Sequence, residues 1–153
     1  MRRILILLAA ASVLCSCGLL DSTPKDLYYW GPSGLQGAYA YEENLYRNFK
    51  EQSPESVCAL ICTYEDVVSN PGGQRNMPPP GICAEYGYLL LQAGTAETFA
   101  NYATDTQKKY FATTAYGDYF RERGAEMFET EMKNYPESAL FLKPLIQKIK
   151  SQL

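Results

Sequence analysis

The chain has 153 residues, a net charge of −3 at pH 7 and no histidine. The missing histidine excludes Ser-His-Asp and Cys-His catalysis in their usual forms and removes the commonest ligand for zinc, copper and non-haem iron. Because an acidic chain is a poor ligand for phosphate backbones, we expect no nucleic-acid partner.

The N-terminus has the layout of a bacterial signal peptide. Arg2 and Arg3 precede an apolar run over residues 4–14 that only Ser12 interrupts. This run is shorter than the roughly 20 apolar residues that a permanent membrane helix needs. It leads into LCSC (residues 14–17), which resembles the lipobox of bacterial lipoproteins. We expect residues 1–16 to be removed as a lipoprotein signal peptide, and Cys17 to carry the lipid, such as palmitate.

The residues after the lipobox indicate a location. Gly18 follows Cys17, where enteric bacteria tend to place an aspartate in lipoproteins that stay in the inner membrane. No acidic run follows that would suggest export to the cell surface. We therefore expect a lipid anchor in the outer membrane, facing the periplasm. Residues 17–26 form a short tether that Pro24 keeps from becoming a helix, and residues 27–153 form a single domain.

An aromatic cluster opens this domain at residues 27–31 (LYYWG). It permits two interpretations: Tyr28, Tyr29 and Trp30 form an exposed patch that binds a partner, or they cover one end of the core. The thirteen tyrosines of the chain suit either role, since their amphipathic rings pack between helices as well as at interfaces.

Apolar spacing predicts helices along the domain. A first helix over residues 34–51 is expected to turn Leu35, Ala38, Leu45, Tyr46 and Phe49 inward. A second helix begins at the pair formed by residues 53 and 54, a serine cap followed by proline at the first helical position. Its apolar surface is wider than one stripe, so this helix should have neighbours on two sides.

Further helices are predicted over residues 81–93, with Gly94 as a C-terminal cap, and over residues 118–135. Residues 95–117 are less decisive and suggest one helix. In the last helix Pro144 either produces a kink or marks the first turn, and the residues expected to be buried are Leu142, Leu145, Ile146 and Ile149. No segment alternates with period two, so we predict an all-α fold of about five or six helices.

The helices are expected to stack in antiparallel pairs as a short tetratricopeptide-like array. Six residues fall near the small, aromatic and final proline positions of a tetratricopeptide repeat. They are Gly87, Tyr88, Leu91, Gly124, Phe128 and Pro136. The stretch between the two helices of this repeat is longer than in a normal tetratricopeptide repeat. Either an extra helix is inserted there, or the repeat interpretation is wrong.

Three cysteines remain in the domain, in a compartment that permits disulfides. Cys58 and Cys62 are one helical turn apart, so a bond between them is awkward, and Cys83 is the better partner for one of them. Buried thiols that act as small apolar residues are the alternative. Three cysteines without histidine make a weak metal site, and we expect neither a metal nor another cofactor.

Candidate acid–base pairs occur on the predicted helices, and we expect none of them to be catalytic. They are Glu42 with Glu43, Glu65 with Asp66, and Glu126 with Glu129 and Glu131. Charges at such positions usually lie on solvated helix faces, and nothing directs them into a shared cleft. We therefore do not expect an enzyme.

Several short motifs resemble the landmarks of a family of bacterial lipoproteins catalogued as domain of unknown function 4810. They are residues 27–31 (LYYWG), 79–81 (PPG), 87–94 (GYLLLQAG), 126–131 (EMFETE) and 135–138 (YPES). The resemblance implies a small tetratricopeptide-like protein, commonly encoded beside a curli-pore-like (CsgG-type) lipoprotein and a second small lipoprotein. It thus implies membership of an envelope assembly and no known reaction.

Two functions follow as hypotheses. The first is a non-catalytic adaptor that binds other envelope lipoproteins or pore components. The alternative is a periplasmic carrier or sensor that holds a peptide or glycan in the concave face of the stack.

Overall fold

The computed structural model describes residues 25–33 and 39–151. These residues form seven α-helices and no sheet, which confirms the all-α fold. The helices are α2 (Ala40–Glu51), α3 (Pro54–Ser69), α4 (Ile82–Leu90), α5 (Thr95–Tyr102), α6 (Asp105–Lys108), α7 (Tyr116–Asn134) and α8 (Ala139–Lys150), with the 3-10 turn η2 (Pro136–Ser138) before α8. The predicted signal peptide and Cys17 lie outside the described residues.

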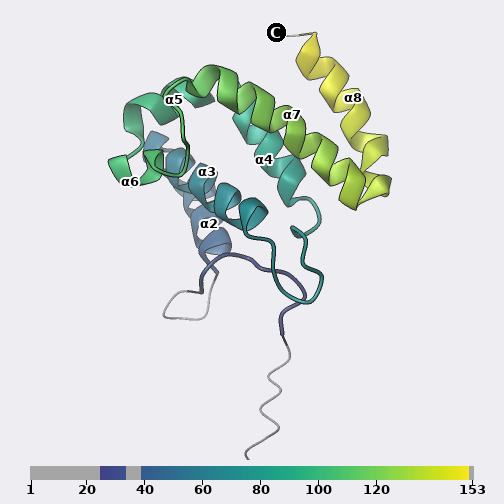
Figure 1. The fold of residues 1–153 in the computed structure, drawn as a ribbon. Coiled ribbons are helices and arrows are strands. Elements are labelled where there is room, and N and C mark those ends of the chain that lie inside the picture. The colour runs from purple at the N-terminus through teal and green to yellow at the C-terminus, as the bar shows by residue number, and fades with distance from the viewer. Residues whose placement is uncertain (1–24, 34–38, 152–153) are drawn as a thin grey trace, which may run out of the picture.

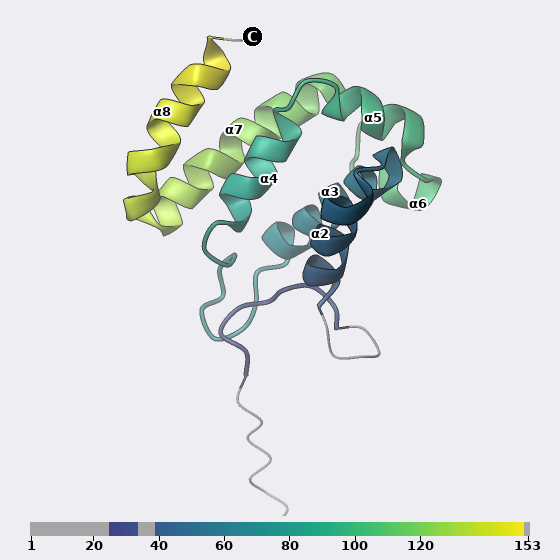
Figure 2. The same cartoon turned by 180° about the vertical axis from the view of Figure 1, so that it is seen from behind.

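The helices form an extended array with α3, α4 and α7 at its centre (Figure 1). Helix α2 packs on α3, α3 also contacts α4 and α5, α4 packs along α7, and α7 contacts α8. The view from behind shows the same order, with α2 and α8 at opposite ends (Figure 2). Since α3 lies between α2 on one side and α4 and α5 on another, the predicted two-sided helix is confirmed.

Helix α3 begins where its sequence predicts. Ser53 caps the helix by accepting a hydrogen bond from the Ser56 amide at 3.2 Å, and Pro54 occupies the first helical position. These two residues satisfy or remove donors that a helix N-terminus otherwise leaves unpaired.

Helix α2 is oriented differently from the prediction. Leu45, Tyr46 and Phe49 are exposed, with 37, 67 and 77% of their surface accessible. The face that meets α3 carries Tyr41 and two polar residues instead: Asn44 donates to the Thr63 hydroxyl at 2.8 Å, and Asn48 accepts from Ser56 at 2.9 Å. These hydrogen bonds, and not the apolar stripe, determine which face of α2 packs on α3. Leu35 and Ala38 lie outside the described residues.

The segment after α4 also differs from the prediction. Helix α4 ends at Leu90, and Gly94, with φ of 82°, is the N-cap of α5 rather than the C-terminal cap of α4. The predicted helix over residues 95–117 is two helices, because Thr104 starts α6 through a capping box with Gln107. Helices α5 and α6 thus connect α4 to α7.

Helices α4 and α7 approach closely at two glycines. A Cβ atom on Gly87 would lie 2.8 Å from the Gly124 carbonyl oxygen, and one on Gly124 would lie 2.7 Å from Leu91 Cγ. Only glycine permits this contact, since real Cβ atoms do not approach so near. The two small positions of the expected repeat therefore face each other, while the tetratricopeptide-like assignment stays a prediction.

Helix α8 is held less firmly. Leu142 is buried, whereas Leu145, Ile146 and Ile149 are half-buried. Pro144 lies inside the helix, so it is not the first turn.

Candidate functional site

A chain of aromatic rings crosses the first half of the array. Trp30, Tyr41, Tyr64 and Tyr86 follow one another with ring centroids 5.3, 5.8 and 5.6 Å apart. Trp30 belongs to the N-terminal segment, and the three tyrosines come from α2, α3 and α4. We call these four residues the tyrosine ladder.

The three residues predicted to bind a partner lie at the start of this ladder, and all are half-buried. The Trp30 ring packs on Tyr41 at a tilt of 36°, and the Tyr29 hydroxyl donates to Asp66 Oδ2 at 2.9 Å. Burial, together with Asp66, raises the pKa of Tyr29 to about 12. The contacts match the interpretation in which Tyr28, Tyr29 and Trp30 cover one end of the core. Partner binding through them stays a prediction.

The tyrosine hydroxyls of the ladder find carboxylate acceptors. Glu85 Oε2 accepts from Tyr41 at 3.0 Å and from Tyr64 at 2.8 Å, and Glu65 Oε2 accepts from the buried Tyr86 at 2.7 Å. A buried hydroxyl without a partner would cost free energy, so these acceptors allow tyrosine where phenylalanine would otherwise be needed. The high tyrosine content thus has a structural use.

Glu65 is buried in an ion pair, not on the solvated face that its sequence position suggests. Arg123 of α7 donates to both of its oxygens, from Nη2 to Oε1 at 2.8 Å and from Nε to Oε2 at 3.2 Å. The glutamate also accepts from Ser69 and Tyr86. Glu65 follows Ile61 by one helical turn and so lies beside the apolar stripe of α3. This position was the sequence signal that could have predicted its burial.

Glu131 is a second buried acid, again contrary to the expected solvated face. Only 3% of its surface is exposed, and its Oε1 accepts from the Gly81 amide at 2.8 Å, at the N-terminus of α4. Burial raises the pKa of this carboxyl, although the backbone amides of α4 oppose the shift. Glu131 therefore caps α4 from α7, a role that depends on tertiary packing and carries no local sequence signal.

The three cysteines in the described part of the chain are free thiols, and all three are buried. The Cys58 and Cys62 thiols point to the Thr98 and Gln107 carbonyls of α5 and α6, each at 3.8 Å, whereas Cys83 lies on α4 near the charges of α7. Of the two alternatives that the sequence left open, the structure has the buried thiols, with no bond from Cys83 to Cys58 or Cys62. Burial raises the pKa of Cys58 to about 11 and those of the other two to about 12, so they behave as apolar side chains.

An apolar groove lies between α4, α7 and α8. It has a volume of about 380 Å³ and is lined by Leu91, Ala125, Phe128, Met132, Ile146 and Ile149, with Arg121 and Glu129 among the lining residues. Phe128 is buried, whereas the other apolar residues are partly or fully exposed. The groove exists because α8 covers α7 incompletely, which no spacing within either helix predicts.

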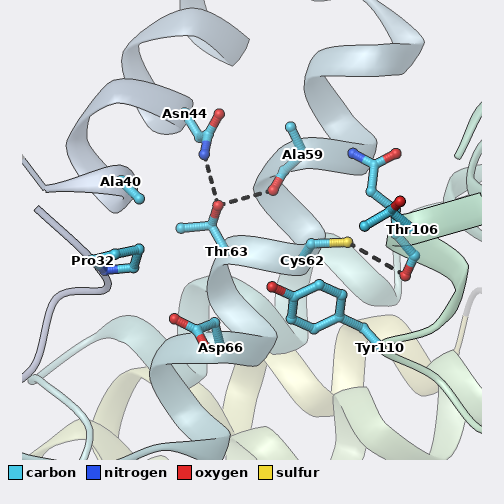
Figure 3. A pocket seen from close by; sticks show the side chains of 10 residues that line it. Pro32, Ala40, Asn44, Ala59, Cys62, Thr63, Asp66, Thr106 and Tyr110 are labelled. Carbon is cyan, nitrogen blue, oxygen red and sulfur yellow. Dashed lines mark hydrogen bonds between the residues drawn. The ribbon is translucent and has the colours of Figure 1, made fainter. Parts of the chain in front are cut away.

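A smaller and more polar pocket of about 300 Å³ lies between α2, α3 and α6 (Figure 3). The Thr63 hydroxyl sits between the Asn44 amide and the Ala59 carbonyl, and the Asp66 carboxylate and Tyr110 lie further along α3 and beyond α6. Asp66 already accepts from Tyr29 and Asn70. The pocket therefore offers oxygen and amide groups that are mostly engaged with protein partners.

Among residues 25–33 and 39–151, no group of three or more cysteine, aspartate or glutamate side chains is arranged to hold a metal ion. Within the same residues, no helix combines the length and apolar character needed to cross a bilayer.

The fold and the grooves define an all-helical domain whose core is crossed by tyrosine–carboxylate hydrogen bonds. A family model described as domain of unknown function (DUF4810) matches residues 27–120. The chain belongs to this family. The matched residues include the tyrosine ladder, whereas most of the apolar groove lies beyond them. No curated protein and no solved structure matches the chain.

Proposed function

We propose that this protein is a lipid-anchored adaptor of the bacterial envelope, which binds another envelope lipoprotein or pore component and catalyses no reaction. The apolar groove between α4, α7 and α8 carries this proposal. Its apolar side chains, among them Phe128, Met132 and Ile146, suit the apolar face of a partner helix. Methionine adapts its shape to such a partner because its side chain is unbranched and flexible.

The anchor and the partner class come from the sequence. The lipobox ending at Cys17 supports a lipid on that residue, with the protein in the outer membrane and facing the periplasm. The family resemblance supports an assembly that includes a curli-pore-like (CsgG-type) lipoprotein. A membrane anchor would hold the groove close to such a partner and raise their effective concentration.

Purification from detergent-solubilised membranes tests the adaptor. The wild type should recover one specific lipoprotein or pore protein, and Met132→Glu and Ile146→Glu should lose it because each places a charge in the groove. Ala100→Glu makes a matched change at an exposed position of α5 and should keep the partner. Repeated recovery of the wild-type protein alone would contradict the proposal.

Labelling with a radioactive fatty acid tests the anchor separately. The label should be incorporated into the wild type and lost in Cys17→Ala, because the lipobox cysteine is the acceptor. A variant that keeps the label would exclude Cys17 as the lipidated residue.

The polar pocket of Figure 3 favours a second candidate, a carrier of a peptide or glycan fragment. Amide, carboxylate and aromatic side chains such as Asn44, Asp66 and Tyr110 are typical of sites for polar ligands. A ligand would bind here beside, or in exchange for, the hydrogen bonds that Asn44 and Asp66 make within the protein. A ligand that binds only the folded state raises its stability. A periplasmic small-molecule extract should then raise the melting temperature of the wild type more than that of Asn44→Ala, and equal melting temperatures with and without extract would exclude this function.

A further inference from the structure

The two helices at the ends of the array turn apolar side chains to solvent. On α2 these are Leu45, Tyr46 and Phe49, and on α8 they are Leu140 and Phe141, which are 76 and 74% exposed. We call the first set the α2 end face and the second the α8 end face. These side chains stay exposed although α2 packs on α3 and α8 contacts α7.

Such end faces are unusual for a helical array. Helices within an array bury both sides, whereas the terminal helices normally carry a polar outer surface that keeps the array soluble. Here large apolar side chains interrupt the polar surface at both ends. Exposed aromatic side chains at the ends indicate that the array continues into another molecule.

The charges of the two end helices are complementary. Helix α8 contains lysines and no acid, and Lys143 and Lys148 are exposed. Helix α2 begins with the exposed pair Glu42 and Glu43, whereas its cations Arg47 and Lys50 lie in its second half, where Arg47 pairs with Glu51. The opposite charges favour contact between the α8 end face and the α2 end face over contact of the α8 end face with itself.

The spacing of the residues gives this contact a direction. On α2, Glu42 precedes Phe49 by two helical turns, and on α8, Phe141 precedes Lys148 by the same distance. If the helices run antiparallel, Phe141 meets Phe49 while Lys148 meets Glu42. A parallel arrangement would bring each lysine or glutamate against an aromatic ring and lose the ion pair.

We propose that the α8 end face of one molecule docks on the α2 end face of a second copy of this chain. Because helices α2 and α8 lie at opposite ends of the array (Figures 1 and 2), one molecule does not join its own end faces. The contact is heterologous, so repetition builds open chains or rings of lipoproteins on the membrane. This self-association is separate from the apolar groove, which stays free for the adaptor's partner.

Sedimentation velocity of the lipidated full chain in detergent tests the proposal. The wild type should associate further as its concentration rises, and Phe49→Ser or Phe141→Ser should weaken the association by at least about tenfold, the effect of losing roughly 1.4 kcal/mol. Tyr102→Ser changes a half-exposed aromatic residue of α5 and should associate as the wild type does. Helical circular dichroism checks that each variant is folded.

Mixing the two variants tests the direction of the contact. Phe49→Ser keeps the α8 end face and Phe141→Ser keeps the α2 end face, so an equimolar mixture should form dimers and nothing larger. Dimers of Phe49→Ser alone would instead show an isologous contact between α8 faces and would overturn the proposal. A wild type that stays monomeric at every concentration would also overturn it.

Charge reversal gives an independent measurement. Glu42→Lys and Lys148→Glu should each weaken the association, and the double variant should restore it, because every contact then regains an opposite pair. A double variant as weak as the single variants would contradict the antiparallel register. Met132→Glu should leave self-association unchanged, so failure of this proposal can be told from failure of the adaptor.

Discussion

The tyrosine ladder and the aromatic cluster beside α5 solve the same packing problem differently. The cluster gathers Phe99, Phe111, Tyr116 and Phe120 in edge-to-face contacts, with Phe99 at 5.1 to 5.4 Å from the other three rings. The ladder stacks or tilts its rings and ties their hydroxyls to Glu65 and Glu85. Both regions bury large rings, but only the ladder adds directional hydrogen bonds.

This difference predicts which substitutions destabilise each region. Phenylalanine rings contribute burial and shape, so the cluster is sensitive to lost volume. The ladder also fixes the positions of α2, α3 and α4 relative to one another through pairs of phenol and carboxylate. It is therefore sensitive to a change of charge or of a single oxygen atom.

The largest effect is expected in the cluster. Phe99 has no exposed surface, so Phe99→Ala removes its contacts and leaves a cavity, at a cost of about 4 kcal/mol in the free energy of unfolding. Phe49→Ala, at an exposed position, should cost below about 0.5 kcal/mol. Urea denaturation followed by circular dichroism measures both, and similar values for the two variants would contradict the described packing.

The next largest effect is expected beside the ladder, at the buried ion pair. Arg123→Met leaves the Glu65 carboxylate without its cation and should cost about 3 kcal/mol. The matched control is Arg121→Met, whose pair with Asp118 is exposed and should contribute below about 0.5 kcal/mol. The double variant Arg123→Met with Glu65→Leu should recover part of the loss, and no recovery would argue against an uncompensated charge as its cause.

Exchanging single hydroxyl groups compares the two regions directly. Phe120→Tyr brings an oxygen into the apolar cluster and should cost about 2 kcal/mol if it stays unpaired. Tyr64→Phe removes the hydrogen bond to Glu85 and should cost about 1 kcal/mol. Equal tolerance of both changes in urea denaturation would show that the regions do not differ as described.

The smallest effect is a pH dependence at Glu131. Since burial raises the pKa of this carboxyl in the folded state, the folded protein holds the proton more tightly than the unfolded chain. Its contribution to stability is therefore full below the unfolded pKa and is lost as pH rises through the folded pKa. We therefore expect the difference in unfolding free energy, wild type minus Glu131→Gln, to decrease as the pH rises from the unfolded pKa through the folded pKa. A flat or rising difference would contradict the direction of the shift.

The sequence predicted local features and missed tertiary ones. The Ser53 cap, the two-sided character of α3 and the inward side of α7 at Phe120 and Phe128 follow from spacing and capping, and the structure confirms them. The orientation of α2 and the burial of Glu131 were wrong in the prediction. In both cases a polar contact with another helix determines which side chains are buried. The periodicity within one helix does not predict that contact.

The candidate sites divide in the same way. A lipid on Cys17 is a prediction of the sequence alone, and so is a partner in the envelope. The groove between α4, α7 and α8, by contrast, depends on how far α8 stands from α7, and the end faces depend on which side of α2 meets α3.

The sequence by itself determined the helical class, the Ser53 cap and the family, because short-range periodicity, capping residues and family motifs are local features of the chain. Only the tertiary structure decided which apolar residues stay exposed. Each helix can pack only some of its faces against neighbouring helices. On α2 the packed face carries Tyr41 and two hydrogen-bonded asparagines, and the stripe of Leu45, Tyr46 and Phe49 stays exposed.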